Sequence, residues 1–224
     1  LSRHLKIISF VAHSMLTIIS HSESLSSIHK DLVAIAEQVA PLLSESLQTL
    51  GPVAFPAPNK VSVGSFLART VVGQQLSTRV ARMMWNRVLD TTVSQTLSIP
   101  SCFSAASVAT LRHCGLSTNK TKSLLALGQA ERDGLLNETY LRGLTHQERT
   151  QQLTKIFGVG PWTCDMVSIF HYRCPDVWPE GDITVQKMFK GLIGQRKPSP
   201  TASQFAPYRS YLALCMWKLV DSKR

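Results

Sequence analysis

The sequence predicts an all-α fold, and three observations support this prediction. Apolar residues recur at spacings of three and four along most of the chain, as amphipathic helices require. The alternation typical of strands is nearly absent. The 224 residues are 44% hydrophobic and 17% charged, so the chain is a folded one, long enough to bury a sizeable core.

The predicted helices follow one another with clear boundary signals. The first spans Ile28 to Leu43, with Ser26 or Ser27 as its N-cap. Gly51 to Asn59 contains three prolines and predicts a connector. Further helices are expected at 66–72, at 78–89, from 111 with a break at 114–117 and a restart near 119, at 145–156, from 182 to about 190 and at 203–220.

The net charge favours a polyanionic partner. Lysine and arginine exceed aspartate and glutamate by 10, which points to nucleic acid first and to a membrane surface second. No apolar run reaches the ~20 residues that a membrane span needs. We therefore expect a nucleic-acid partner and no membrane insertion.

The first residues leave two interpretations open. The apolar run from Ile7 to Ile19 follows Arg3 and Lys6, as in a signal or transit peptide. No small-residue cleavage site follows, which favours a disposable or locally packed segment instead. We set residues 1–27 apart as an N-terminal extension, disordered or targeting, ahead of a domain over residues 28–224.

A glycine turn lies in the last third of the chain. Residues 153–163 read LTKIFGVGPWT, in which Gly158 and Gly160 flank Val159 and Pro161 opens the second helix. Exposed N–H groups at that helix start would bind an anion such as phosphate. Taken alone, the turn fits an ordinary helical hairpin equally well.

Five blocks in order resemble the helix-hairpin-helix DNA glycosylase superfamily, and within it the 3-methyladenine DNA glycosylase II type. They read VGQQLS (72–77), LRHCGLSTNK (111–120), FGVGPWTCDM (157–166), PDVWPEGDITV (175–185) and PYRSYLALCMW (207–217). The resemblance implies two helical subdomains, one built from about 28–65 and 175–224 and the other from about 66–174. It places the active-site cleft between them and the hairpin at its rim.

The resemblance assigns the catalytic role to Asp182. Cleaving an N-glycosidic bond builds positive charge on the sugar, which a fixed carboxylate stabilises while it positions or activates water. Without the surrounding blocks, Asp182 would be taken for a helix N-cap. One departure is Gly181, where close relatives often carry a second acid.

Two absences point to a monofunctional enzyme. Relatives similar to endonuclease III carry a lysine at the hairpin position of Trp162, and that amine attacks the sugar through a Schiff base. Tryptophan cannot do so, hence water is the expected nucleophile and an abasic site the expected product. The five cysteines are widely spaced and only Cys215 lies near the C-terminus, so we expect no iron–sulfur cluster, no zinc site and no disulfide framework.

The resemblance also supplies the pocket and the DNA contacts. Trp162 and Trp217 match the residues that line the base pocket, where electron-rich faces suit a cationic alkylated purine. Met166 stands where relatives often carry an aromatic residue. The expected DNA-binding residues are Gly158, Val159, Gly160, Thr163, Gln74, Gln75, Leu76 and Ser77. Gln75 is the expected wedge that fills the gap left by the flipped base, with Leu76 as the alternative.

No cofactor is required by this chemistry, although family hairpins often hold a Na⁺ or K⁺ ion. Here its ligands would be the carbonyls of Thr154, Ile156 and Val159. His113, His146 and His171 have no metal-ligand spacing and are interpreted as structural.

The expected function is removal of alkylated purines of the 3-methyladenine and 7-methylguanine type from double-stranded DNA, by a monomer. Two alternatives stay open: a glycosylase of the same fold for an oxidised, deaminated or mismatched base, and a non-catalytic DNA-binding protein. The expected location is the cytoplasm and nucleoid of a bacterium or the nucleus of a eukaryote, with organelle targeting as a further alternative.

Overall fold

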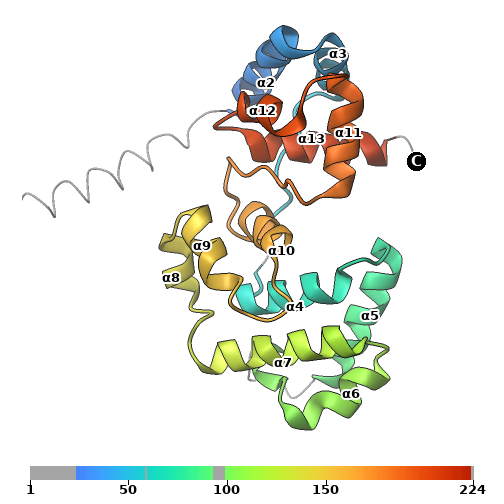
Figure 1. Ribbon diagram of the computed structural model, residues 1–224, viewed down its shortest axis with the longest axis vertical. Coiled ribbons are helices and arrows are strands. Elements are labelled where there is room, and N and C mark those ends of the chain that lie inside the picture. Colours follow the sequence, from blue (N-terminus) through green and yellow to red (C-terminus); the bar gives the residue numbers. More distant parts are fainter. Residues whose placement is uncertain (1–23, 59, 93–98, 223–224) are drawn as a thin grey trace, which may run out of the picture.

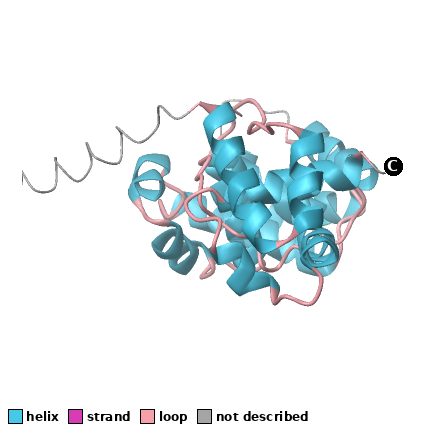
Figure 2. Ribbon diagram, turned by 90° about the horizontal axis from the view of Figure 1, so that it is seen from above, coloured by secondary structure: helices cyan, strands magenta, loops and turns pink. Residues whose placement is uncertain are grey.

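The structure is a computed structural model that describes residues 24–58, 60–92 and 99–222. Within these residues it consists of helices and loops and has no strand (Figure 2), which confirms the all-α prediction. No helix in this part of the chain is long and apolar enough to span a membrane. The prediction for residues 1–23 lies outside the described residues.

The helices fall into two groups in space (Figure 1). The terminal lobe comprises α2 (Leu25–Val39), α3 (Pro41–Leu50), α11 (Ile183–Ile193), α12 (Pro198–Ser203) and α13 (Arg209–Asp221). The central lobe comprises α4 (Val63–Gly73), α5 (Thr78–Thr91), η2 (Ile99–Cys102), η3 (Ala105–Ser107), α6 (Val108–His113), α7 (Thr118–Arg132), α8 (Glu138–Gly143), α9 (His146–Leu153), α10 (Pro161–Met166) and the π-turn η4 (Val167–His171).

Each lobe has its own hydrophobic cluster. Leu67, Leu124 and Leu127 are fully buried at the centre of the central lobe, and Leu43, Phe189 and Leu212 at the centre of the terminal lobe. The N-terminal helices and the C-terminal helices therefore share one core, although the central lobe separates them in the sequence. The subdomain limits drawn from the sequence stay a prediction.

A smaller cluster lies where the lobes meet. Met166 from α10, Ile169 from η4 and Leu214 from α13 are buried in it together with Phe55 and Val177. Phe55 belongs to the expected connector, which has no helix over its described residues 51–58 and 60–62. The connector thus contributes to the packing at the junction as well as joining the lobes.

The N-terminal region differs from the sequence prediction in the number of helices and in the N-cap. The helix expected over 28–43 is two helices, α2 and α3, because Ala40 takes an extended conformation and Pro41 opens a new helix. The N-cap of α2 is Ser24, which accepts a hydrogen bond from the Ser27 amide, so the expected caps Ser26 and Ser27 are wrong.

The last expected helix, 203–220, is also wrong as a single element. Within this range only Ser203, the last residue of α12, and residues 209–220 of α13 are helical, and a non-helical stretch that contains Pro207 separates the two helices. Pro207 has no N–H to donate within a helix, which accounts for the interruption. The side chain of Arg209 then contacts both carboxylate oxygens of Asp176, at 2.6 and 2.8 Å, and this pair ties the start of α13 to the loop before α11.

Candidate active site

The candidate catalytic carboxylate of Asp182 is held from three sides. Its Oδ1 accepts the backbone N–H of Val185 at 2.9 Å, which makes Asp182 the N-cap of α11. Its Oδ2 accepts the indole N–H of Trp162 at 3.0 Å, and Oδ1 accepts that of Trp217 at 3.3 Å. The side chain is therefore both a helix cap and the meeting point of α10, α11 and α13, so the two interpretations of Asp182 are compatible.

Gly181 allows this close arrangement. A Cβ built on Gly181 would stand 3.3 Å from the Cβ of Trp162, tighter than most such contacts. Glycine here lets the loop before α11 approach α10 so that the Trp162 indole reaches Asp182. The glycine at position 181 thus has a packing reason in this chain.

A cavity of about 1040 Å³ opens beside Asp182. Its lining comes from the α4–α5 turn, the α9–α10 hairpin and the start of α11: Gln74, Gln75, Thr154, Lys155, Ile156, Phe157, Gly158, Val159, Gly160, Pro161, Trp162, Thr163, Gly181, Asp182, Ile183 and Thr184. The cavity brings together most of the residues that the sequence singled out. Its mostly loop-borne lining leaves backbone N–H groups near a carboxylate, as a nucleotide site would need.

Trp217 and Met166 do not line this cavity. Trp217 is half-buried and packs on Phe170, with ring centroids 5.2 Å apart. Met166 is 7% exposed and belongs to the cluster against which both tryptophans pack. Met166 therefore belongs to the packing behind the tryptophans. Of the three predicted pocket residues, Trp162 alone lines the cavity.

The hairpin turn is fixed from behind by α7. Gly158 has φ +85°, and a Cβ there would stand 1.9 Å from the Ser123 Oγ and 2.5 Å from the Ser123 Cβ. Any side chain at Gly158 would collide with α7, because the overlap includes the Ser123 Cβ that no rotamer change moves. By contrast, a Cβ on Gly160 would meet nothing within 4 Å. The two glycines of the motif therefore serve different purposes.

Several predicted DNA-binding side chains have partners within the protein. The Gln74 amide donates to the Gly158 carbonyl at 3.2 Å and to the Thr163 Oγ1 at 3.0 Å, which links the α4–α5 turn to the hairpin. Thr163 and Val159 are buried, and the Ser77 hydroxyl caps α5 by accepting the Val80 N–H. These residues would face a ligand through their backbone groups.

The two candidate wedge residues differ in exposure. Gln75 is exposed and has φ +57°, in the left-handed region that non-glycine residues rarely adopt. Leu76 is half-buried and packs against the central core. The Lys120 amine donates to the Val72 and Gln74 carbonyls at 2.7 and 2.9 Å, and burial lowers the pKa of this amine. It holds the turn that presents Gln75.

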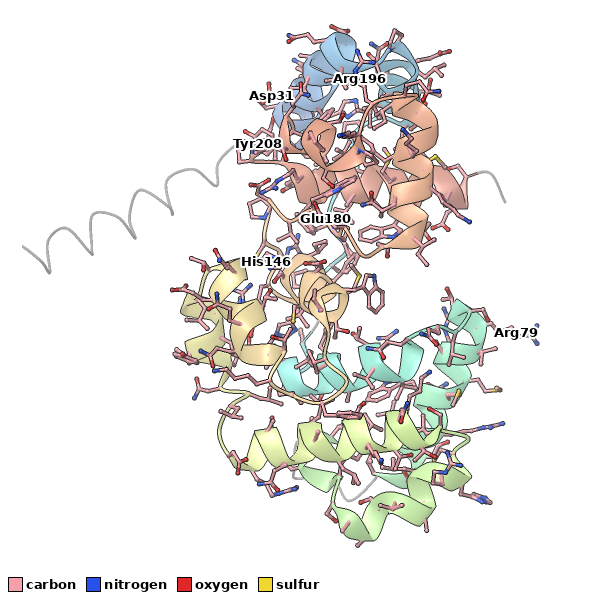
Figure 3. All side chains as sticks on the ribbon, viewed as in Figure 1. Asp31, Arg79, His146, Glu180, Arg196 and Tyr208 are labelled. Carbon is pink, nitrogen blue, oxygen red and sulfur yellow. The ribbon has the colours of Figure 1, made fainter. Side chains whose placement is uncertain are left out.

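A second acidic residue lies near Asp182. Asp165 is 8% exposed, and its Oδ1 stands 3.2 Å from the Nε2 of His146, the first residue of α9 (Figure 3). Burial raises the pKa of the Asp165 carboxyl, the His146 contact lowers it, and the charges of Glu180 and Asp182 raise it further. The sequence interpretation missed Asp165, although its place one helical turn after Trp162 puts it on the same side of α10.

The described residues contain no group of three or more histidine, cysteine, aspartate or glutamate side chains that could hold a metal ion. In the same residues the five cysteines are free thiols.

The fold and the site together define the class: this chain has the fold of the helix-hairpin-helix DNA glycosylases and resembles the 3-methyladenine type in sequence. It is 28% identical over 161 residues to DNA-3-methyladenine glycosylase 1 of Schizosaccharomyces pombe, across 68% of this chain and 70% of that protein. No family model matches the chain.

Solved structures agree with this likeness. A DNA-3-methyladenine glycosidase from Bacillus halodurans superposes with a TM-score of 0.71 at 26% identity, across 86% of this chain and 90% of that one. The Schizosaccharomyces pombe 3-methyladenine DNA glycosylase Mag1, in complex with abasic DNA, superposes with a TM-score of 0.69 at 22% identity, across 87% and 96%.

Proposed function

We propose that this protein is a monofunctional DNA glycosylase of base excision repair that hydrolyses the N-glycosidic bond of alkylated purines and leaves an abasic site. The observation that carries the proposal is Asp182, held by two indole N–H groups and a helix N-terminus at the edge of a large cavity. The DNA partner and the alkylated substrate are those named for the relatives above.

Asp182 stabilises the positive charge that grows on the sugar as the base departs. Three donors fix the carboxylate before the substrate arrives, so little reorganisation is needed in the transition state. The same carboxylate positions a water molecule for attack on the sugar. An alkylated purine is a cationic leaving group and requires little general-acid assistance.

Trp162 is the base-recognition residue that supports this substrate best. Trp162 lines the cavity, and its indole N–H donates to the Asp182 carboxylate. An aromatic face attracts a cationic base by about 0.5–2 kcal/mol. Since position 162 holds no amine, no Schiff base forms there, and the strand stays continuous after base release.

The hairpin is proposed to bind a phosphate of the damaged strand through its backbone N–H groups, and Gln75 to enter the gap left by the extruded nucleotide. A monovalent cation would fit the carbonyls of Thr154, Ile156 and Val159, which belong to the same cavity wall. The Ile156 carbonyl accepts one hydrogen bond, from Val159 N at 3.0 Å, and retains a second lone pair. Such an ion would add positive charge beside the phosphate.

The test is release of free base from duplexes that each carry one lesion: 3-methyladenine, 7-methylguanine, 8-oxoguanine, hypoxanthine or a mismatched thymine. We expect release of the two methylated purines and of none of the others. Preferential release of an oxidised, deaminated or mismatched base over the methylated purines would contradict the proposed substrate class. Binding without release of any base would show a non-catalytic DNA-binding protein.

A further inference from the structure

We propose that Phe157 and Ile183 form an apolar contact surface for the damaged DNA strand, covering sugar and base faces of the nucleotides next to the extruded one. Both residues line the cavity that contains Asp182. The proposal rests on the proposed binding of duplex DNA and names two residues of that interface which carry neither charge nor hydrogen bonds in their side chains.

Ile183 lies on the face of α11 that points away from the hydrophobic core. It is the first residue of α11 and is 72% exposed, the largest value among the exposed large hydrophobic side chains described. The buried face of α11 carries Val185, Phe189 and Ile193. Two residues along a helix correspond to about 200° of rotation, so Ile183 stands nearly opposite Val185, away from the core and beside the catalytic carboxylate.

Phe157 is exposed for a related reason. Its neighbours Ile156 and Val159 are buried, with side chains only 6% and 4% exposed, whereas Phe157 is 55% exposed at the tip of the hairpin. The contact between Gly158 and Ser123 on α7 fixes the turn from the other side. The hairpin therefore cannot rotate Phe157 into the core without breaking the packing behind it.

Location distinguishes these two residues from other exposed apolar side chains. Leu42 and Leu135 are 59% and 52% exposed but do not line the cavity, and isolated exposed apolar residues are ordinary on protein surfaces. Phe157 and Ile183 come from different segments, and both lie on the walls of the one cavity that Trp162 and Asp182 also line. Two apolar groups at one functional opening indicate a ligand with apolar faces.

DNA with an extruded nucleotide offers such faces. When one base leaves the stack, its neighbours lose a stacking partner, and proteins that act on extruded bases cover the gap with apolar or aromatic side chains. Two side chains are far too small a surface for a protein partner, which needs about 800 Å² on each side. The net charge of +10 keeps the phosphates close while the two side chains contact sugars and bases.

The proposal predicts a contribution to affinity that salt does not screen. The probe is a duplex with a stable abasic-site analogue, with affinity measured by fluorescence anisotropy at several salt concentrations. We expect Phe157→Ser and Ile183→Ser each to weaken binding about tenfold at every salt concentration. The slope of log K against log salt should stay that of the wild type, because neither substitution removes a phosphate contact.

Leu42→Ser and Leu135→Ser are the matched controls, since they remove equally exposed apolar side chains away from the cavity. Both should bind the probe like the wild type, and all four variants should melt at the wild-type temperature. The proposal would be overturned if Phe157→Ser and Ile183→Ser bound the duplex with wild-type affinity. It would also be overturned if the two control variants lost as much affinity as these two. Because the probe has no base to release, this result is independent of whether the wild type excises alkylated purines.

Discussion

The hairpin turn and the turn that carries Asp182 face the same cavity but are held in opposite ways. At the hairpin, Gly158 has no side chain, and this absence lets the turn rest on Ser123 of α7. At the second turn, the Asp182 side chain itself makes the contacts, with Trp162, Val185 and Trp217. One turn is positioned by backbone packing and the other by polar side-chain contacts.

This difference separates two tasks. A turn that binds a phosphate through its N–H groups needs its backbone fixed and uncovered, which glycine permits. A turn that acts on developing charge needs a fixed carboxylate, which the hydrogen-bond donors supply. Substitutions of the hairpin glycines should therefore affect stability and binding, whereas substitutions of Asp182 and of its two indole donors should affect the chemical step.

The largest expected effect is that of Asp182→Asn on excision. Asparagine keeps the N-cap through its carbonyl oxygen but loses the negative charge, so single-turnover base release should fall about 10²-fold or more. Melting temperature and affinity for abasic DNA should change little. Release at the wild-type rate would remove Asp182 from the mechanism, and loss of the folded state would reduce it to a helix cap.

The two hairpin glycines provide the next test. Gly158→Ala should lower the free energy of unfolding by about 2–3 kcal/mol, because its Cβ overlaps Ser123 and its φ is positive. Gly160→Ala has open space around its Cβ, so its free energy of unfolding should lie within about 0.5 kcal/mol of the wild-type value. Urea denaturation measures both, and equal losses would contradict the assigned division of roles. Gly160→Ala should still weaken DNA binding, which anisotropy measures.

The two tryptophans should contribute unequally to excision. Trp162→Phe removes the indole donor to Oδ2 at 3.0 Å, whereas Trp217→Phe removes a longer contact to Oδ1, which still accepts the Val185 N–H. We expect single-turnover excision to fall about tenfold for Trp162→Phe, the equivalent of one lost hydrogen bond to a charged group, and less for Trp217→Phe. The reverse order would mean that Oδ1, rather than Oδ2, carries the critical orientation.

The smallest expected effect concerns Asp165 and pH. Burial raises the pKa of this carboxyl, so the folded protein holds its proton more tightly than the unfolded chain does. Its contribution to stability is full below the ordinary aspartate pKa of about 4 and is lost as pH rises through the folded value. Asp165→Asn cannot ionise, so its stability relative to the wild type should increase over that interval. Urea denaturation at a series of pH values measures this, and a difference independent of pH would contradict it.

Much of the fold could be predicted from local signals. Glycine, proline and apolar spacing located α4, α5, α7 and α10 within a few residues, because those signals act on neighbouring positions. Pro41 and Pro207 are equally local signals, because Pro41 opens α3 and Pro207 lies in the non-helical stretch before α13.

The site was predictable only in part. The blocks named Asp182, Trp162 and Trp217, but the two hydrogen bonds among them join residues 20 and 35 positions apart, and nothing in local spacing gives their partners. The contact of Lys120 with the Gln74 carbonyl depends on how α7 packs against the α4–α5 turn, and the packing of Met166 against the tryptophans depends on how the two lobes meet. Only the three-dimensional arrangement supplies these contacts.

The measurement that most directly tests the central claim is borohydride trapping during base release, with strand continuity followed on the same duplex. The substrate is DNA with 7-methylguanine, and the enzyme is the wild-type chain with Trp162 in the hairpin. We predict free 7-methylguanine, a strand that breaks only after alkali or heat, and no covalent enzyme–DNA adduct. An efficiently trapped adduct, with strand cleavage before alkali, would show that a lysine attacks the sugar and would contradict hydrolysis by water at Asp182.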